Sequence, residues 1–424
     1  MEALVIAVQL NVGADVPTWR ADEDLRIGSM DGGPSAFGSV IDVEVNGRGD
    51  IFVLDGQAAQ IPVFTAQGGF LRTLGRRGQG PGEFQSFREA GWKGDTLWVV
   101  DPQASRVTMM SEADSVFATI TIRSSVALEG AAVGVRPGPL LADGSVLAYG
   151  SGTAYSLSGA VSPRLPIYRT DRGADSLHVL MTFDASKEFM VYGAGSMLRQ
   201  PVSDRKLFAV ARDGRSLWYL DRSVSGPDPP GRTWLTNTSI SGDTLSHHSI
   251  AYEPVPFDDG HFNALVDSVV GAARDTGVPE QFVETMREAL QESAFRPSHH
   301  PPATHLVAGS DSTVWLRLQQ PEVSEAAQWL VFSAAGAMIA RLHLPQGLQM
   351  HRATLQTIWG SMVGPFDEPY VVRLRVSREW PATRRASGPA SGRTGGARPS
   401  TCGTRSRSLG RPPTASRRLP RPRG

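Results

Sequence analysis

Four aspartates lie at or near the ends of short apolar runs, where their carboxylates could take part in chemistry: Asp42, Asp55, Asp101 and Asp221. If the fold brings them together, they would suit a divalent cation, which prefers oxygen ligands. Alternatively, each aspartate accepts hydrogen bonds from nearby backbone and ends its strand in a turn, a common role for this residue. We expect the turn role, and we predict no metal site.

The loop of residues 75–84 is a second place where the chain could contact a ligand. It holds four glycines and one proline, which excludes a helix or a central strand and predicts a turn with positive φ angles. Its backbone N–H groups could bind an anion, and we name Arg76, Arg77 and Glu83 as candidate ligand-binding residues. The alternative is a plain connection whose arginines are solvated or paired with Glu83. The loop does not lead from a strand into a helix, as nucleotide-phosphate fingerprints require.

Six histidines form the clusters that most resemble metal ligands in the sequence: His247, His248, His261, His299, His300 and His305. Zinc needs three or four ligands in fixed geometry. Prolines follow His300 directly and predict an extended loop there, so we interpret these histidines as solvated. The sequence has neither a Gly-x-Ser-x-Gly elbow nor a His-Glu-x-x-His motif. We therefore name no catalytic residue and predict no cofactor.

A repeated phrase indicates how these residues are positioned. It is a Gly-Asp turn followed by an apolar strand that ends in aspartate, and it occurs at 49–55, 94–101 and 213–221, with looser copies at 143–148 and 311–316. A second phrase, a strand, a glycine turn and a strand, occurs at 63–71 and 331–339 and is typical of a hairpin. Asp55 and Asp101 are 46 residues apart, which matches a four-stranded propeller blade. A β-sandwich would explain the turns but not two phrases at a fixed offset.

The repeats predict an all-β fold, a six-bladed β-propeller, with seven blades as the alternative. The expected blades span residues 36–74, 84–123, 133–182, 205–252, 303–344 and 352–376. The last blade is short, and we expect residues 19–27 to add the outer strand that closes the ring. Aromatic residues at equivalent strand positions should pack between blades: Phe52, Phe64, Trp98, Trp218, Trp315, Phe332 and Trp359.

Between the fourth and fifth blades, the apolar period changes from two to about 3.6 over residues 258–293. One apolar face comprises Leu265, Val266, Val269, Val270 and Ala273, and a second comprises Phe282, Val283, Met286, Ala289 and Leu290. This pattern predicts an inserted helical hairpin. We expect the hairpin to be a lid packed on the rim of the propeller, with partner binding or substrate gating as the alternative.

The formal net charge of zero hides an uneven distribution. Residues 377–424 hold twelve of the 42 basic residues and one of the 42 acidic ones, which leaves 30 basic and 41 acidic residues in the rest of the chain. We therefore separate an acidic body, residues 19–376, from an Arg/Pro-rich tail that we expect to be disordered. The tail is either a basic arm for nucleic acid or an anionic surface, or the product of an out-of-frame gene end, which we favour.

The remaining features of the chain bear on its location. The single cysteine, Cys402, lies in the tail, so neither a disulfide framework nor a cysteine-based zinc site is expected. Residues 1–18 form an N-terminal segment that begins with a short apolar run, lacks a basic region and contains Glu2. It is a poor signal peptide as it stands and could be the remnant of one. We predict no transmembrane segment, because no apolar run approaches 18 residues.

The quoted phrases resemble a known family. Residues 49–55 followed by 63–70 resemble an NHL-type repeat, and 75–84 is similar to a loop of the bacterial 6-bladed β-propeller family. Residues 344–374 resemble the end of those proteins. The resemblance covers residues 19–376 and implies the propeller fold and an extracytoplasmic protein, exported or lipid-anchored, of undefined activity. The chain lacks the lipobox cysteine of anchored members, and the family supplies no catalytic residues.

Together these observations predict a function in binding more than in catalysis. We expect a non-enzymatic binding or scaffold propeller, a monomer, that recognises a protein, peptide or glycan through loops at one end. The alternative is a divalent-metal-dependent propeller hydrolase, lactonase or lyase. Binding of nucleic acid would depend on the tail, and the acidic body argues against it.

Overall fold

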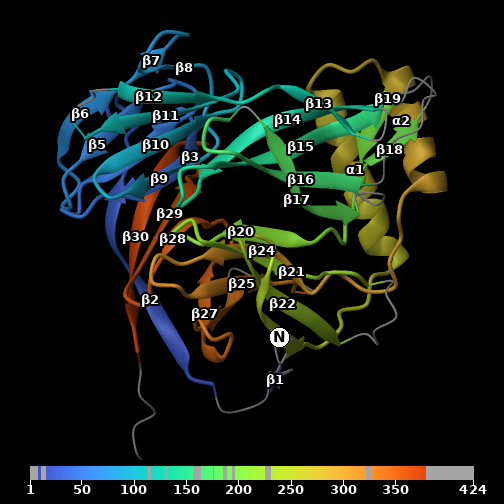
Figure 1. The fold of residues 1–424 in the computed structure, drawn as a ribbon. Coiled ribbons are helices and arrows are strands. Elements are labelled where there is room, and N and C mark those ends of the chain that lie inside the picture. The colour runs from blue at the N-terminus through green and yellow to red at the C-terminus, as the bar shows by residue number, and fades with distance from the viewer. Residues whose placement is uncertain are drawn as a thin grey trace, which may run out of the picture. The chain divides into compact units, whose positions relative to one another are not determined.

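The chain folds into six blades of four or five mainly antiparallel strands, which form a propeller (Figure 1). Blades five and six are joined into one eight-stranded sheet, because β2 (Thr18–Ile27) pairs in parallel with β27 (Met338–Pro345) at Thr18 and Trp19. The computed structural model describes residues 8–10, 16–112, 116–128, 131–155, 164–174, 176–184, 189–192, 196–224, 231–320 and 326–378. The predicted all-β, six-bladed propeller with a helical hairpin is confirmed. The predicted tail lies almost entirely outside the described residues, because they end at Arg378.

The first three blades follow the chain in order. Blade one consists of β3 (Val40–Val45), β4 (Ile51–Asp55), β5 (Ile61–Phe64) and β6 (Phe70–Leu74). Blade two consists of β9 (Ala90–Lys93), β10 (Thr96–Asp101), β11 (Arg106–Ser111) and β12 (Val116–Thr121). Blade three consists of β13 (Ser125–Leu128), β14 (Ala131–Leu140), β15 (Val146–Tyr155), β16 (Arg164–Thr170) and β17 (Leu177–Asp184).

Two of the other three blades, four and six, include a strand from the N-terminal region. Blade four consists of β20 (Leu207–Val210), β21 (Ser216–Leu220), β22 (Arg232–Ser239), β23 (Thr244–Ala251) and β1 (Val8–Leu10). Blade five consists of β24 (Ala303–Ala308), β25 (Val314–Leu318), β26 (Ala326–Phe332) and β27 (Met338–Pro345). Blade six consists of β28 (Gln349–Ala353), β29 (Thr357–Val363), β30 (Pro369–Ser377) and β2 (Thr18–Ile27). Two short pairs stand apart from the blades, β7 (Arg76–Arg77) with β8 (Glu83–Phe84) and β18 (Phe189–Tyr192) with β19 (Ser196–Arg199).

The Gly-Asp phrase of the sequence forms the tight turn between the first two strands of a blade. Gly49, Gly94 and Gly214 have φ angles of 90°, 60° and 67°, a region that glycine enters without steric cost. In blade five the equivalent position of the turn is Ser312, which adopts a φ of 64°. The repeated phrase therefore encodes a backbone conformation that glycine accommodates best.

Adjacent blades pack through opposite faces of their second strands. In β4, Ile51 and Val53 lie in the same apolar cluster as Trp359 of blade six. Phe52 and Leu54 instead belong to the cluster that includes β9 and β10 of blade two. Because successive side chains of a strand point to opposite faces, a strand buried on both sides reads as a continuous apolar run. The seven aromatic residues expected between blades are all buried, which confirms that prediction.

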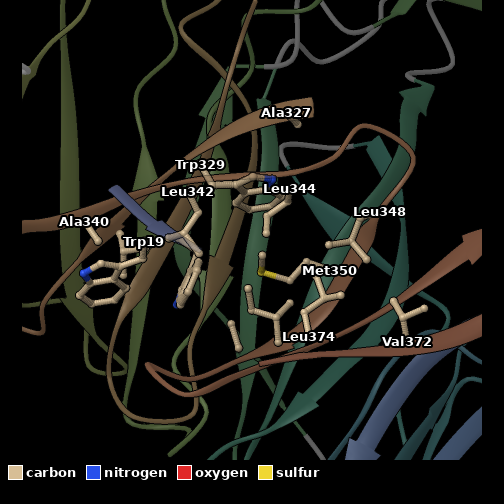
Figure 2. Packing of buried hydrophobic residues seen from close by; sticks show 14 of the residues in the cluster. Trp19, Ala327, Trp329, Ala340, Leu342, Leu344, Leu348, Met350, Val372 and Leu374 are labelled. Atoms are coloured by element: carbon tan, nitrogen blue, oxygen red, sulfur yellow. The ribbon is translucent and has the colours of Figure 1, made fainter. Parts of the chain in front are cut away.

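The junction of blades five and six holds a large apolar cluster (Figure 2). Trp329, Leu342 and Leu344 of blade five lie in this cluster together with Met350 and Leu374 of blade six. Trp19 joins the cluster from β2 and is buried.

The N-terminal strand β2 closes the ring. It runs antiparallel to β30 from Arg20, which pairs with Ser377, to Ile27, which pairs with Val371. This confirms the predicted outer strand of blade six. The short strand β1 pairs in parallel with β23 of blade four, and the sequence pattern does not predict that pairing.

Two helices lie between blades four and five, α1 (Asp259–Asp275) and α2 (Glu280–Ser293). Asp258 caps α1 by accepting a hydrogen bond of 2.9 Å from the backbone N–H of His261, and α2 begins directly after Pro279. The predicted apolar faces pack against each other except at Leu265 and Phe282, which lie outside the cluster between the helices. Phe282 is 53% exposed. Neither helix has the length and apolar character needed to span a bilayer.

Candidate functional site

One strand from each of the six blades borders a single cavity of about 700 Å³, which is the central channel of the propeller. These strands are β3, β9, β14, β20, β24 and β28. The aromatic side chains on the wall are Trp92, Trp98, Tyr149 and Phe208. The ionisable side chains on the wall are Asp42, Glu44, Arg88, Glu89, Tyr149, Arg205, Lys206, Arg212, Asp213, His351 and Arg352.

Glu44 connects three blades by ion pairs across the channel. It extends from β3, where its neighbours Val43 and Val45 alternate with it along the strand. Arg212, from the turn after β20, donates to Oε1 at 2.5 Å, and Arg352 of β28 donates to Oε2 at 2.7 Å. Burial raises the pKa of Glu44, and the two guanidinium groups oppose that rise. The carboxylate therefore holds blades four and six to blade one.

Asp42 lies two residues before Glu44, on the same face of β3, and is also buried. Its Oδ1 accepts the backbone N–H of Val43 at 2.8 Å, and its Oδ2 accepts that of Ala90 in blade two at 2.9 Å. Burial raises the pKa of Asp42. His351 approaches with Nδ1 at 3.7 Å from Oδ1, and burial followed by the charge of Arg212 lowers the pKa of His351 to about 4. Asp42 thus fixes blade two against blade one.

Glu89 has no such set of partners. Its Oε1 is buried without a hydrogen bond, and the Nε atom of Arg88 lies 3.5 Å away. Burial raises the pKa of Glu89 to about 7, with a further rise from Asp42 and an opposing effect of Arg88 and Arg212. The guanidinium of Arg88 lies over the ring of Tyr149, 4.3 Å from its centroid. The wall therefore places a carboxyl that titrates near neutrality, Glu89, beside an arginine, Arg88, that lies over the ring of Tyr149.

The other three aspartates named from the sequence serve the backbone or pair with lysine. Asp55 accepts hydrogen bonds from Gly38 and Ser39, directly before β3, at 3.1 Å each. Asp101 binds the equivalent loop before β9, at Gln85 and Ser86. Asp221 pairs with Lys206 at 3.0 Å. Asp221 also accepts the backbone N–H of Ser223, two residues on, at 3.0 Å. Only Asp42 of the four lines the channel, and the expected turn role describes Asp55, Asp101 and Asp221 correctly.

Arg76, Arg77 and Glu83 lie on the loop between blades one and two, and none of them lines the channel. Arg76 pairs with Glu83 at 2.6 Å, and Arg77 donates to the carbonyl of Gln57 at 2.6 Å. The backbone N–H of Gly80 donates to Glu83 at 2.8 Å, and these hydrogen bonds lower the pKa of Glu83. Arg76 and Glu83 also line a separate cavity of about 320 Å³. Their role in ligand binding stays a prediction.

The histidines named from the sequence are spread over several parts of the molecule. His261 of α1 and His300 have ring centroids 5.2 Å apart, and Asp258 accepts from the Nδ1 side of His261 at 2.8 Å. His247 stacks on Trp234 at 4.3 Å. Within the described part of the chain, no group of three or more histidine, cysteine, aspartate or glutamate side chains could hold a metal ion.

Sequence reasoning missed most of the channel residues, namely Glu44, Arg88, Glu89, Tyr149, Arg212 and Arg352. A signal for one of them, Glu89, exists. Val43 pairs with Val53 in blade one and Ala90 with Val99 in blade two, so Asp42 and Glu89 occupy equivalent positions before these pairs. An acid at the same place in both blades of the repeat identifies a channel-facing position. The arginines carry no such signal, because they reach the channel from different positions of their blades.

Comparisons with known proteins agree with this architecture. Residues 36–103, which contain blade one and the first two strands of blade two, match a family model described as 6-bladed beta-propeller. No curated protein matches the chain. The NHL-type character of the repeats stays a prediction.

Three solved structures with low sequence identity are similar to the chain. A Bacteroides fragilis protein named as an exported protein is 10% identical, with a TM-score of 0.44, over 88% of this chain and all (100%) of that one. Regucalcin of Agrobacterium tumefaciens, named as a calcium-binding protein, is 10% identical with a TM-score of 0.34, over 87% and 97% of the two chains. Virginiamycin B lyase of Staphylococcus aureus is 10% identical with a TM-score of 0.38, over 84% and 99%.

Proposed function

We propose that this protein is a non-enzymatic binding propeller that recognises carboxylate groups of a protein, peptide or glycan at its central channel. The observation that carries the proposal is the position of Arg88. Its side chain is 39% exposed, stacks on Tyr149 and faces the cavity. An arginine held flat on an aromatic ring is well placed to bind a carboxylate through two parallel hydrogen bonds.

The charges around Arg88 favour an anionic ligand. Glu44 is already bound to two arginines, and Asp42 is bound to two backbone N–H groups. Glu89 is the acid beside Arg88, and its pKa of about 7 leaves it partly neutral at physiological pH. Lys206 also lies on the wall, is 37% exposed and pairs with Asp221 at 3.0 Å. The wall carries five basic side chains (Arg88, Arg205, Lys206, Arg212 and Arg352) and four acidic ones (Asp42, Glu44, Glu89 and Asp213). Its formal charge is therefore slightly positive, and more so when Glu89 is neutral.

An array experiment tests the proposal. The full chain is applied to immobilised acidic peptides and uronic-acid oligosaccharides, with neutral peptides and neutral oligosaccharides of equal length as references. We expect retention on the acidic members, reduced by high salt and strongly reduced in Arg88→Ala. Arg172→Ala is the matched control, because this exposed arginine lies outside the channel. Equal retention of neutral and acidic members, or unchanged binding by Arg88→Ala, would refute the proposal.

The metal-dependent hydrolase, lactonase or lyase of the sequence analysis gains no support from the described residues. Glu44 is bound to two arginines and Asp42 to two backbone N–H groups, and no metal-ligand group is found among the residues with described side chains. We therefore do not carry it as a second candidate.

An extracytoplasmic location is part of the proposal and rests on the sequence resemblance described above. Fractionation of the native organism, with an antibody against the propeller, tests it. Recovery of the protein in the cytoplasmic fraction alone would contradict it.

A further inference from the structure

Glu89 is an acidic group for which the proposed binding of carboxylates gives no role, although it lies beside the arginine that would bind them. Its Oε1 is buried and lacks a hydrogen bond, at 3.5 Å from Arg88 Nε. The side chain as a whole is 31% exposed, and it lines the channel cavity. A buried carboxylate oxygen without a hydrogen bond is costly when it is charged. The position thus favours a neutral carboxyl unless Arg88 compensates its charge.

The groups around Glu89 come from several elements. Arg88 precedes it on the same loop, Asp42 reaches it from β3, and Arg212 reaches it from the turn between β20 and β21. Tyr149 of β15 also faces it, and burial keeps the pKa of that phenol well above its usual value. Asp42 repels a charge on Glu89, whereas both arginines attract it. Arg212 is already bound to Glu44, so Arg88 is the arginine left to pair with Glu89.

We infer that Arg88, Glu89 and Tyr149 form a proton-controlled subsite for a carboxylate, a conclusion that rests on the proposed function. When Glu89 is ionised, it pairs with Arg88 and repels an incoming carboxylate. When Glu89 takes up a proton, Arg88 becomes available to the ligand and the neutral carboxyl can donate a hydrogen bond to it. One proton is therefore bound to the protein for each ligand carboxylate held at this subsite.

The pKa of Glu89, raised to about 7, places the change in the neutral range. A group with this pKa is about 90% protonated at about pH 6 and about 10% protonated at about pH 8. If only the protonated form is competent, the apparent Kd is the intrinsic Kd divided by the competent fraction. The expected weakening between these two pH values is therefore about tenfold. The ligand's own carboxyl stays ionised over this range, because its ordinary pKa is about 4.

The experiment is a calorimetric titration of the full chain at about pH 6 and about pH 8. Tetraglutamate and tetragalacturonate are the two probes, so that the experiment separates a peptide source of the carboxylate from a glycan source. We expect wild-type affinity to fall about tenfold at the higher pH, with proton uptake on binding. Glu89→Gln should bind at both pH values as the wild type binds at the lower one. Glu288→Gln is the control, since Glu288 is exposed on α2.

The outcomes separate this inference from the proposed function. Binding of either probe with equal affinity at both pH values, or a Glu89→Gln variant that keeps the wild-type pH dependence, overturns the proton-controlled subsite and leaves carboxylate binding intact. Failure of both probes to bind at either pH, in the wild type and in Glu89→Gln, overturns both.

Discussion

Replacement of Glu89 by glutamine should stabilise the protein above neutral pH. Burial raises the pKa of Glu89 from 4.5 to about 7 in the folded state. Between these two values the folded state holds a proton that the unfolded state has released, so the stability of the wild type falls as the pH rises through this window. Below about pH 4 both states are protonated, and above about pH 8 both are ionised. Glutamine carries no charge, so the variant escapes the loss.

The size of the effect follows from the shift. Each pKa unit corresponds to about 1.4 kcal/mol, so the full shift is worth about 3 kcal/mol at most. The side chain is 31% exposed to the channel. Water there screens its charge, so we expect the shift to contribute about half of this free energy. We therefore expect Glu89→Gln to match the wild type at about pH 4 and to exceed its unfolding free energy by about 1–3 kcal/mol at about pH 8.

Urea unfolding of both proteins at several pH values and constant ionic strength, followed by tryptophan fluorescence, measures this difference. His351, whose pKa is lowered to about 4, makes both proteins less stable as the pH falls from its ordinary value of about 6.5. That contribution cancels when the two proteins are compared. A stability difference that does not change with pH, or that favours the wild type at high pH, would refute the conclusion that folding raises the pKa of Glu89.

Three further substitutions test the fold around the site. Glu44→Gln should lower the unfolding free energy by about 3 kcal/mol, because it leaves two partly buried arginines without their counter-charge. Glu23→Gln, at an exposed ion pair, should change it by less than about 1 kcal/mol. Equal effects in chemical denaturation would argue against the role of Glu44 in holding the blades together. Asp101→Ala should cost about 1–3 kcal/mol in the same assay, since several backbone N–H groups of blade two lose their acceptor, and a neutral result would contradict that role. Trp19→Ala should lower the unfolding free energy by about 3–5 kcal/mol and speed proteolysis of β2. An unchanged cleavage rate would show that β2 is held without this side chain.

Most of the fold could be predicted because it depends on patterns within short stretches of the sequence. The apolar run Ile51–Asp55 and its copies predict strands buried on both faces, and the glycines before them predict the left-handed turns. Closure by β2 follows from a blade that lacks its outer strand. The parallel pairing of β1 could not be predicted, because three residues carry no pattern that names their partner. Phe282 satisfies the helical period yet is exposed, because the period does not show how far the partner surface extends.

The candidate site could be predicted only in part. Asp42 was named with three other aspartates, and the sequence does not distinguish the one that faces the channel from those that bind backbone. That difference depends on register, since Asp42 lies within its strand and Asp55 ends the next one. Arg212 and Glu44 are far apart in the sequence and meet because the ring brings blade four opposite blade one. Only the closed propeller creates that contact, so no local pattern records it.

The ladder between β2 and β30 also determines how the propeller would respond to mechanical force. Arg20 and Ser377 form the pair at one end of this ladder, so the chain enters β2 and leaves β30 at the same end of the two strands. Once the pairs of β1 with β23 and of Thr18 and Trp19 with β27 were broken, tension between these two points would load the Arg20–Ser377 pair first and then each following pair in turn. The strands would separate one pair at a time instead of shearing together. The ring would then open at the outer edge of blade six, while the strand that carries Arg352 stayed paired within its sheet.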